Sequence, residues 1–244
     1  MKIMQVDYMI KAIAESLLND REIVFIGLNS FIPYIASFMA RDFYKKKIRI
    51  TGVFETDNPE PLILSPSTGN PNIAEKGPIF TTYEAFDLAQ KGKLDVMFLG
   101  PAQIDDKGNV NISVIGSYDK PKVRLPGGAA TAFLVPLVKR DIFWSVKHSK
   151  RVAVKRVDFI TGSFANSNNE AYFVTNLGVM KYSREERCWI TIAVYENTSF
   201  DDIALNSDFC VKPSEKVDII KLNEEERKFI DRLDPYSLRS SLES

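Results

Sequence analysis

Hydrophobic residues in the first hundred positions alternate between helical and strand-like spacing. Apolar side chains recur at helical spacing over residues 8–18, and residues 23–26 form a short apolar run that Gly27 closes. The pattern predicts a second helix over residues 30–44 and a second strand over residues 48–54. A continuous apolar run is typical of a strand covered on both faces. The chain is therefore expected to begin with a β-α-β unit.

The same alternation continues beyond residue 80. A helix is predicted over residues 83–91, a buried strand over 94–100, and a hairpin in a mixed sheet around the turn at 105–109. Small residues over 127–131 are expected to open a short helix. Further strands are expected at residues 142–146, 152–154, 171–174, 178–182 and 189–195, and further helices at residues 200–206 and 224–233.

No internal repeat, low-complexity tract or Gly/Ser linker divides the chain. We therefore interpret residues 1–244 as a single α/β domain in which helices surround a mixed, largely parallel sheet. The segment at residues 58–78 contains five prolines and is expected to be a long loop. Long loops in compact domains are usually functional, so this loop is a candidate wall of a substrate pocket.

Composition and charge exclude several classes of protein. The 244-residue chain has no formal net charge, because 32 Lys and Arg residues balance 32 Asp and Glu residues. Without a positive field, a nucleic-acid partner is not expected. The sequence contains no run of about eighteen apolar residues, the length that a helix needs to cross a bilayer. The N-terminus lacks the apolar core of a signal peptide. We expect a soluble, cytoplasmic protein without membrane contact.

The sequence offers few candidate metal ligands. Cys188 and Cys210 lack CxxC spacing and are expected to pack as separate small hydrophobic side chains in a reducing cytosol. His148, the single histidine, has no acidic or histidine neighbour at ligand spacing and is expected at the surface. No metal site is therefore predicted.

Open α/β sheets bind ligands beyond the carboxyl ends of their strands, and one carboxylate stands at such a place. Glu55 directly follows the predicted strand over residues 48–54. A carboxylate fixed by a rigid strand can act as a nucleophile or a general base. The alternative is a structural role, in which Glu55 accepts hydrogen bonds from the following turn.

A glycine-rich segment is the second candidate. Gly127, Gly128 and Ala129 can present backbone N–H groups to an oxyanion, or they can form a tight turn. Other pocket candidates lie where predicted strands end: Gly27, Asn29, Gly100 and Gln103. The chain lacks the GxSxG, GxxxxGK[ST] and GxGxxG motifs, which argues against a serine hydrolase, a P-loop nucleotidase and a dinucleotide-binding enzyme.

A long ordered string is the most specific signal in the chain. It comprises GPAQIDDKGNVN at residues 100–111, VIG at 114–116 and KPKVRLPG at 120–127, and shorter matches occur at residues 174–179, 196–200 and 232–235. These segments resemble the β subunit of class I CoA-transferases, in particular the glutaconate CoA-transferase type. The resemblance covers nearly the whole chain.

The resemblance implies the three-layer α/β/α sandwich of the CoA-transferase superfamily, around a mixed, largely parallel sheet. It also implies an α subunit as partner in a heterodimer or heterotetramer, with an acyl-CoA and a carboxylic acid as substrates and no permanently bound cofactor. Glu55 matches the family's catalytic glutamate. The segment that begins at Gly127 and Gly128 aligns with its oxyanion loop.

The implied reaction is a CoA transfer through a glutamyl-CoA thioester on Glu55. The chain departs from the family pattern at Thr56 and Asp57, where small residues and glycine are usual, and at Ala129 and Ala130, which replace two glycines. An acyl-CoA ring-opening hydrolase subunit and a non-catalytic, CoA-sensing subunit are therefore alternatives.

Overall fold

The computed structural model of the chain describes residues 4–242. Its contacts group the chain into two compact units. Unit 1 contains the chain up to Phe98 and from Ile220 onward, and unit 2 contains the residues from Leu99 to Ile219. The prediction of a single domain over the whole chain stays a prediction.

Unit 1 contains three parallel strands. β1 (Ile23–Ile26) pairs with β2 (Arg49–Gly52) on one side and with β3 (Val96–Leu99) on the other. Val24 of β1 lies opposite Val96 of β3, and both side chains are completely buried. The apolar runs form strands as predicted because both faces of this sheet are covered.

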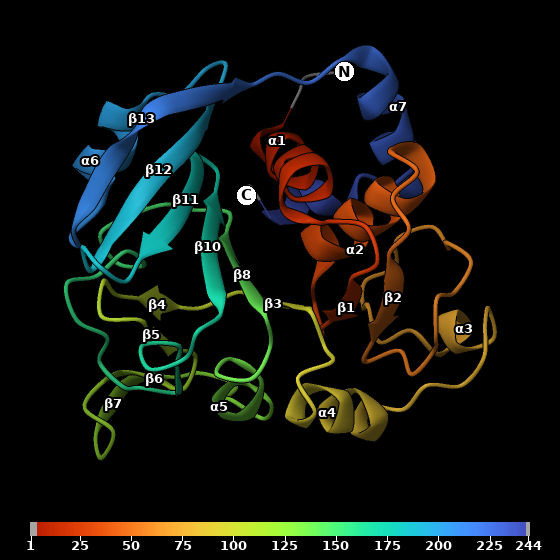
Figure 1. Cartoon of the computed structure of the whole chain (residues 1–244), viewed down its shortest axis with the longest axis horizontal. Helices are drawn as coiled ribbons and strands as arrows, with labels where there is room; N and C mark the ends of the chain where they lie inside the picture. The colour runs from red at the N-terminus through yellow and green to blue at the C-terminus, as the bar shows by residue number, and fades with distance from the viewer. Residues whose placement is uncertain (1–3, 243–244) are drawn as a thin grey trace. The chain divides into compact units, whose positions relative to one another are not determined.

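The helices of unit 1 are α1 (Gln5–Lys11), α2 (Phe31–Phe38), α3 (Pro71–Ala74), α4 (Thr82–Gln90) and α7 (Glu224–Leu233). α1 and α2 lie against each other (Figure 1), and they continue into the π-helical segments η1 (Ala12–Leu17) and η2 (Met39–Phe43). The C-terminal segment, which ends in the 3-10 helix η3 (Leu238–Leu242), is tied to α1 by two buried ion pairs. Lys11 Nζ lies 2.6 Å from Glu226 Oε1, and Arg239 Nε lies 2.8 Å from Asp7 Oδ1.

Unit 2 contains a mixed sheet in the order β8-β10-β11-β12-β13. Its strands are β8 (Arg140–Ser145), β10 (Glu170–Thr175), β11 (Gly178–Ser183), β12 (Cys188–Tyr195) and β13 (Val211–Ile220). β10 runs parallel to β8 and antiparallel to β11, which is antiparallel to β12. The Trp189 ring packs on Phe164, Phe173 and Tyr182 with centroid distances of 5.2–6.0 Å, so the core of this unit is aromatic.

The remaining elements of unit 2 are short. They are β4 (Gln103–Ile104), β5 (Asn109–Asn111) and β9 (Gly162–Ser163) in a three-stranded sheet, the hairpin β6 (Val114–Gly116) and β7 (Pro121–Arg124), and the helices α5 (Thr131–Leu134) and α6 (Phe200–Asn206). Figure 1 shows β4 to β7 in yellow-green shades, with α5 following in green. These short elements carry the string of residues that resembles the CoA-transferases.

Several predicted elements differ from the structure. The strand predicted over 48–54 ends at Gly52, because the Glu55 N–H donates to the Gly52 carbonyl at 3.0 Å and closes a turn. The hairpin of β4 and β5 belongs to the small sheet with β9, and not to the main sheet. Residues 152–154 form only an isolated bridge, whereas β13 was not predicted. The loop over 58–78 contains the short helix α3.

Two expectations about single residues are also wrong. Cys188 and Cys210 form a disulfide, with Cα atoms 4.9 Å apart, because β13 begins next to the start of β12. His148 is buried, and its Nδ1 and Nε2 lie 3.1 Å from Thr175 Oγ1 and 2.9 Å from Ser207 Oγ. Burial lowers the pKa of His148 to about 4, so the ring is neutral at neutral pH.

Candidate active site

Glu55 lies in the turn that follows β2. Its backbone has a φ of 58°, in the left-handed region that favours glycine. The backbone is held on both sides, because the Glu55 N–H donates to Gly52 and the Glu55 carbonyl accepts from the Phe80 N–H at 3.2 Å. Strained backbone of this kind is concentrated at functional sites. The turn therefore fixes the backbone position from which the Glu55 side chain extends.

The Glu55 side chain is exposed and reaches the first residue of α4. Its Oε1 accepts from the Thr82 N–H at 3.3 Å. The preceding Thr81 caps the helix, because its Oγ1 accepts from the Glu84 N–H while the Glu84 carboxylate accepts from the Thr81 N–H. The N–H groups of a first helical turn attract negative charge, so the start of α4 is a favourable partner for the Glu55 side chain, which stays exposed to solvent.

The two residues after Glu55 are structural. Thr56 is buried and its hydroxyl donates to the Ala74 carbonyl at 3.0 Å. Asp57 accepts from Arg49 Nη2 at 2.9 Å, and its N–H donates to the Pro78 carbonyl at 2.9 Å. These hydrogen bonds connect the turn after β2 to the proline-rich segment.

The turn after β1 lies beside the turn after β2. Gly27 directly follows β1, and the Val53 N–H donates to the Ile26 carbonyl at 3.0 Å. The Gly27 carbonyl accepts from the Thr68 hydroxyl at 2.7 Å. Asn29 is exposed with a φ of 50°. Within unit 1, the structure therefore brings Gly27 and the turn that leads to Glu55 to one edge of the sheet.

Gly100 and Gln103 lie in unit 2. A Cβ at Gly100 would lie 3.3 Å from the Trp144 ring, so glycine allows the backbone to pass this ring closely. Gln103 is buried, and its Oε1 accepts from Asn111 Nδ2 at 2.7 Å and from the Asp158 N–H at 2.9 Å. Its amide oxygen is thus occupied within the protein. Only its amide nitrogen remains to contact a substrate.

The glycine-rich loop presents backbone N–H groups. The Gly127 N–H donates to the Ile112 carbonyl at 2.8 Å, and Gly127 has a φ of 86°. Within residues 4–242, the N–H groups of Gly128, Ala129 and Ala130 have no hydrogen-bond acceptor. Neither alanine has a positive φ, so the replacement of glycine here causes no backbone strain. The loop keeps the unpaired donors that an oxyanion hole requires.

Comparison with known proteins places the chain in a family. A family model described as coenzyme A transferase matches residues 6–206. The chain belongs to the coenzyme A transferase family. Glu55 and the loop at Gly128 both lie inside the matched segment of this coenzyme A transferase chain, and the predicted family resemblance is confirmed.

Curated relatives include two transferases and a hydrolase. The chain is 28% identical over 172 residues to the B-type subunit of 3-oxoadipate CoA-transferase from Pseudomonas knackmussii. This match covers 65% of this chain and 66% of the relative. The chain is 25% identical over 153 residues, or 57% of each chain, to the B-type subunit of glutaconate CoA-transferase from Acidaminococcus fermentans. It is 27% identical over 223 residues to the cholesterol ring-cleaving hydrolase IpdB subunit of Rhodococcus jostii, with 85% and 84% covered. The matches therefore span about two thirds or less of the two transferase subunits.

Solved structures confirm the α/β fold. The decarboxylase AibA/AibB superposes with a TM-score of 0.89 at 24% identity, and 99% of each chain is covered. Glutaconate coenzyme A-transferase from Acidaminococcus fermentans superposes with a TM-score of 0.84 at 20% identity, with 97% of each chain covered. The predicted CoA-transferase fold, with its mixed and largely parallel sheet, is therefore correct.

Sequence reasoning missed the Thr82 N–H that holds the Glu55 carboxylate. The capping-box spacing from Thr81 to Glu84 was a readable signal for the start of this helix, but not for the residue that faces it.

Among residues 4–242, no helix is long and apolar enough to cross a membrane. In the same range, no three His, Cys, Asp or Glu side chains are grouped to hold a metal ion.

Proposed function

We propose that the chain is the B-type subunit of a heteromeric CoA-transferase, and that Glu55 carries CoA between an acyl-CoA and a carboxylic acid. The observation that carries this proposal is the geometry of Glu55, an exposed carboxylate on a strained turn beside the Thr82 N–H. The family match and the two relatives named as B-type transferase subunits support it. The same names support an A-type subunit as the partner. The proposed place of action is the cytoplasm.

The proposed reaction divides the exchange into two similar halves. The Glu55 carboxylate attacks the thioester carbonyl, the C–S bond breaks, and an acyl-glutamyl anhydride and CoA thiolate form. The thiolate then attacks the glutamyl carbonyl and releases the donor carboxylate. This leaves a glutamyl-CoA thioester. The acceptor carboxylate then attacks the carbonyl of the glutamyl-CoA thioester and releases CoA thiolate. The thiolate attacks the acceptor's carbonyl in the resulting anhydride, which gives the new acyl-CoA and restores the Glu55 carboxylate.

Each half-reaction passes through tetrahedral oxyanions that need N–H donors. We assign this role to the Gly128 and Ala129 N–H groups, which have no acceptor within the described residues. Gly127 supports them by fixing the loop to Ile112. Gly27, Asn29, Gly100 and Gln103 remain proposed substrate contacts.

A trapping experiment tests the nucleophile. The chain in complex with its A-type subunit is incubated with glutaconyl-CoA or 3-oxoadipyl-CoA, treated with borohydride, digested and analysed by mass spectrometry. The expected result is reduction of Glu55 to the alcohol, with no change at Glu60, an exposed glutamate of the same unit. An active complex whose Glu55 peptide keeps its mass would overturn the proposal.

A hydrolase is the second candidate, favoured by the extent of one match. The ring-cleaving hydrolase subunit aligns over 85% of the chain, more than either transferase subunit. In that case water takes the place of the acceptor acid, and Glu55→Ala keeps turnover. Measuring thioester loss with and without an added carboxylic acid separates the two functions.

A further inference from the structure

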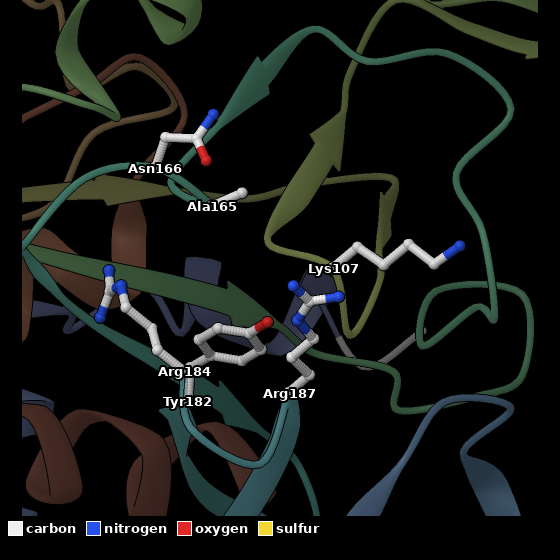
Figure 2. A pocket seen from close by; sticks show the side chains of 6 residues that line it. All are labelled: Lys107, Ala165, Asn166, Tyr182, Arg184 and Arg187. Carbon is white, nitrogen blue, oxygen red and sulfur yellow. The ribbon is translucent and has the colours of Figure 1, made fainter.

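Unit 2 contains a cavity in which three of the six lining residues are cationic. It has a volume of about 300 Å³ and is lined by Lys107, Ala165, Asn166, Tyr182, Arg184 and Arg187 (Figure 2). Lys107 comes from the turn between β4 and β5, whereas Arg184 and Arg187 come from the turn between β11 and β12. In Figure 2 the two arginine side chains lie on either side of the Tyr182 ring.

The cationic side chains of this cavity form no direct ion pairs with other described residues, although Asp105 and Asp106 lie close enough to add to the effect of burial in raising the pKa of Tyr182. Within residues 4–242, none of Lys107, Arg184 and Arg187 forms an ion pair. Two nearby acidic side chains are engaged elsewhere. The Asp105 carboxylate accepts from the Lys107 and Asn109 N–H groups, and Glu186 pairs with Lys212. A chain without net charge therefore has a local cationic site.

Arg184 is held in place by two hydrogen bonds. Its Nη2 donates to Asn169 Oδ1 at 2.7 Å and to the Phe164 carbonyl at 3.4 Å. Its Nε is buried and has no hydrogen-bond partner. The two hydrogen bonds of Nη2 therefore fix the guanidinium group at the wall of the cavity, whereas the buried Nε does not face it.

The acid behind Arg184 does not form an ion pair with it. Asn169 Nδ2 donates to Asp141 Oδ2 at 2.5 Å, so Asn169 separates Asp141 from Arg184. Complete burial raises the pKa of Asp141 well above its usual range, which favours the neutral acid. The site therefore keeps its positive charge.

The other side of the cavity is also fixed. Arg187 has a φ of 48°, a left-handed conformation that is uncommon for a side chain of this size. The Tyr182 hydroxyl donates to the Asp106 carbonyl at 2.6 Å, and its ring packs on Phe164 with a centroid distance of 5.2 Å. The cavity thus has a rigid aromatic wall between two arginines.

We propose that this cavity binds a phosphate group, either as inorganic phosphate or as the monoester of a larger molecule. Two guanidinium groups and an ammonium group offer more donors than the two oxygens of a carboxylate can accept, and they match the oxygens and double charge of a phosphate. The volume exceeds that of one small ion, since a water molecule occupies about 30 Å³ in the liquid. The proposal does not depend on Glu55.

Titration of the full-length chain with inorganic phosphate tests the proposal, with ³¹P NMR and calorimetry as readouts. We expect saturable binding to one site that weakens as salt is added. Arg187→Gln should weaken binding about tenfold or more, because it removes one positive charge and its charge-assisted hydrogen bond to the phosphate. Arg151→Gln, which changes an exposed arginine of the same unit, should leave the affinity unchanged.

Adenosine monophosphate is the second probe. Equal affinity for both probes indicates a site for the phosphate group alone, and tighter binding of the nucleotide indicates a monoester ligand. Arg187 and Lys107 are exposed, so Arg187→Gln and Lys107→Gln should melt at the wild-type temperature. Absence of saturable binding of both probes, or unchanged affinity in Arg187→Gln, would overturn the proposal. Glu55→Gln should bind phosphate normally, so this result is independent of the proposed transferase activity.

Discussion

The turn after β2 and the loop before α5 leave different chemical groups of the chain open. In the turn, backbone hydrogen bonds hold Glu55 on both sides and the side chain alone is exposed. In the loop, the N–H groups of Gly128 and Ala129 are unpaired within the described residues, and the side chains are small. A covalent nucleophile needs a fixed carboxylate, and an oxyanion needs fixed N–H donors. The difference is that the turn exposes a side-chain carboxylate, whereas the loop exposes backbone N–H groups.

The largest effect expected is loss of transfer when the carboxylate is removed. Glu55→Gln keeps the size of the side chain but cannot form an anhydride, so kcat for CoA transfer should fall about a thousandfold or more. Glu60→Gln is the matched control and should retain normal turnover. Steady-state kinetics of the complex with its A-type subunit measures both. Wild-type turnover in Glu55→Gln would show that the turn carries no nucleophile.

The next effect tests whether the buried His148 of unit 2 stabilises the fold in its neutral form. His148 has an unfolded-state pKa near 6.5 and a folded-state pKa of about 4. Its contribution is complete above pH 6.5 and is lost as the pH falls toward 4, because only the unfolded chain takes up the proton. The difference in unfolding free energy between wild type and His148→Gln should shrink by about 3 kcal/mol across this window.

Urea unfolding of both proteins at several pH values measures that difference. Titrating carboxylates affect wild type and variant equally, so they cancel in the comparison. A constant difference from pH 6.5 to about pH 4 would show that His148 is accessible to protons in the folded protein.

A smaller effect tests the packing of the glycine loop. A Cβ on Gly128 would clash with Thr161 Cγ2, so Gly128→Ala should destabilise the protein by about 2 kcal/mol. Thr161→Ser removes that methyl group but keeps the hydroxyl that accepts from the Ile112 N–H at 3.0 Å. The double variant should therefore recover most of the loss in thermal unfolding. Failure of this rescue would mean that the loop needs glycine for another reason.

The smallest effect tests the strain at Glu55. Because residue 55 has a positive φ, Glu55→Gly should be about 1 kcal/mol more stable than Glu55→Ala, although neither transfers CoA. Denaturant unfolding of the two variants measures the difference. Equal stability would show that the backbone relaxes when the side chain is shortened.

The strands of unit 1 were predictable because their apolar runs reflect burial on both faces. β13 was not predictable in the same way. Most of its residues are exposed and it contains Pro213 and several charges, so its pairing with β12 depends on the backbone and leaves little pattern in the side chains. The Cys188–Cys210 disulfide was missed for the same reason, since it depends on that pairing.

The candidate site was partly predictable. Glu55 and the loop at Gly127 were found from strand ends and from the ordered string that resembles the CoA-transferases. The burial of His148 was not predicted from the sequence, because its partners Thr175 and Ser207 are distant along the chain. The cationic cavity was also missed, since Lys107 and the two arginines lie far apart along the chain.

The sequence by itself determined the α/β class, the family and the identity of the candidate nucleophile, because hydrophobic periodicity and an ordered motif are local properties of the chain. Only the tertiary structure decided that Glu55 sits on a strained turn against α4, that His148 is neutral, and that three cations share one cavity. These properties depend on which distant segments pack together. Burial and electrostatic environment are set by that packing, and not by the spacing of residues along the chain.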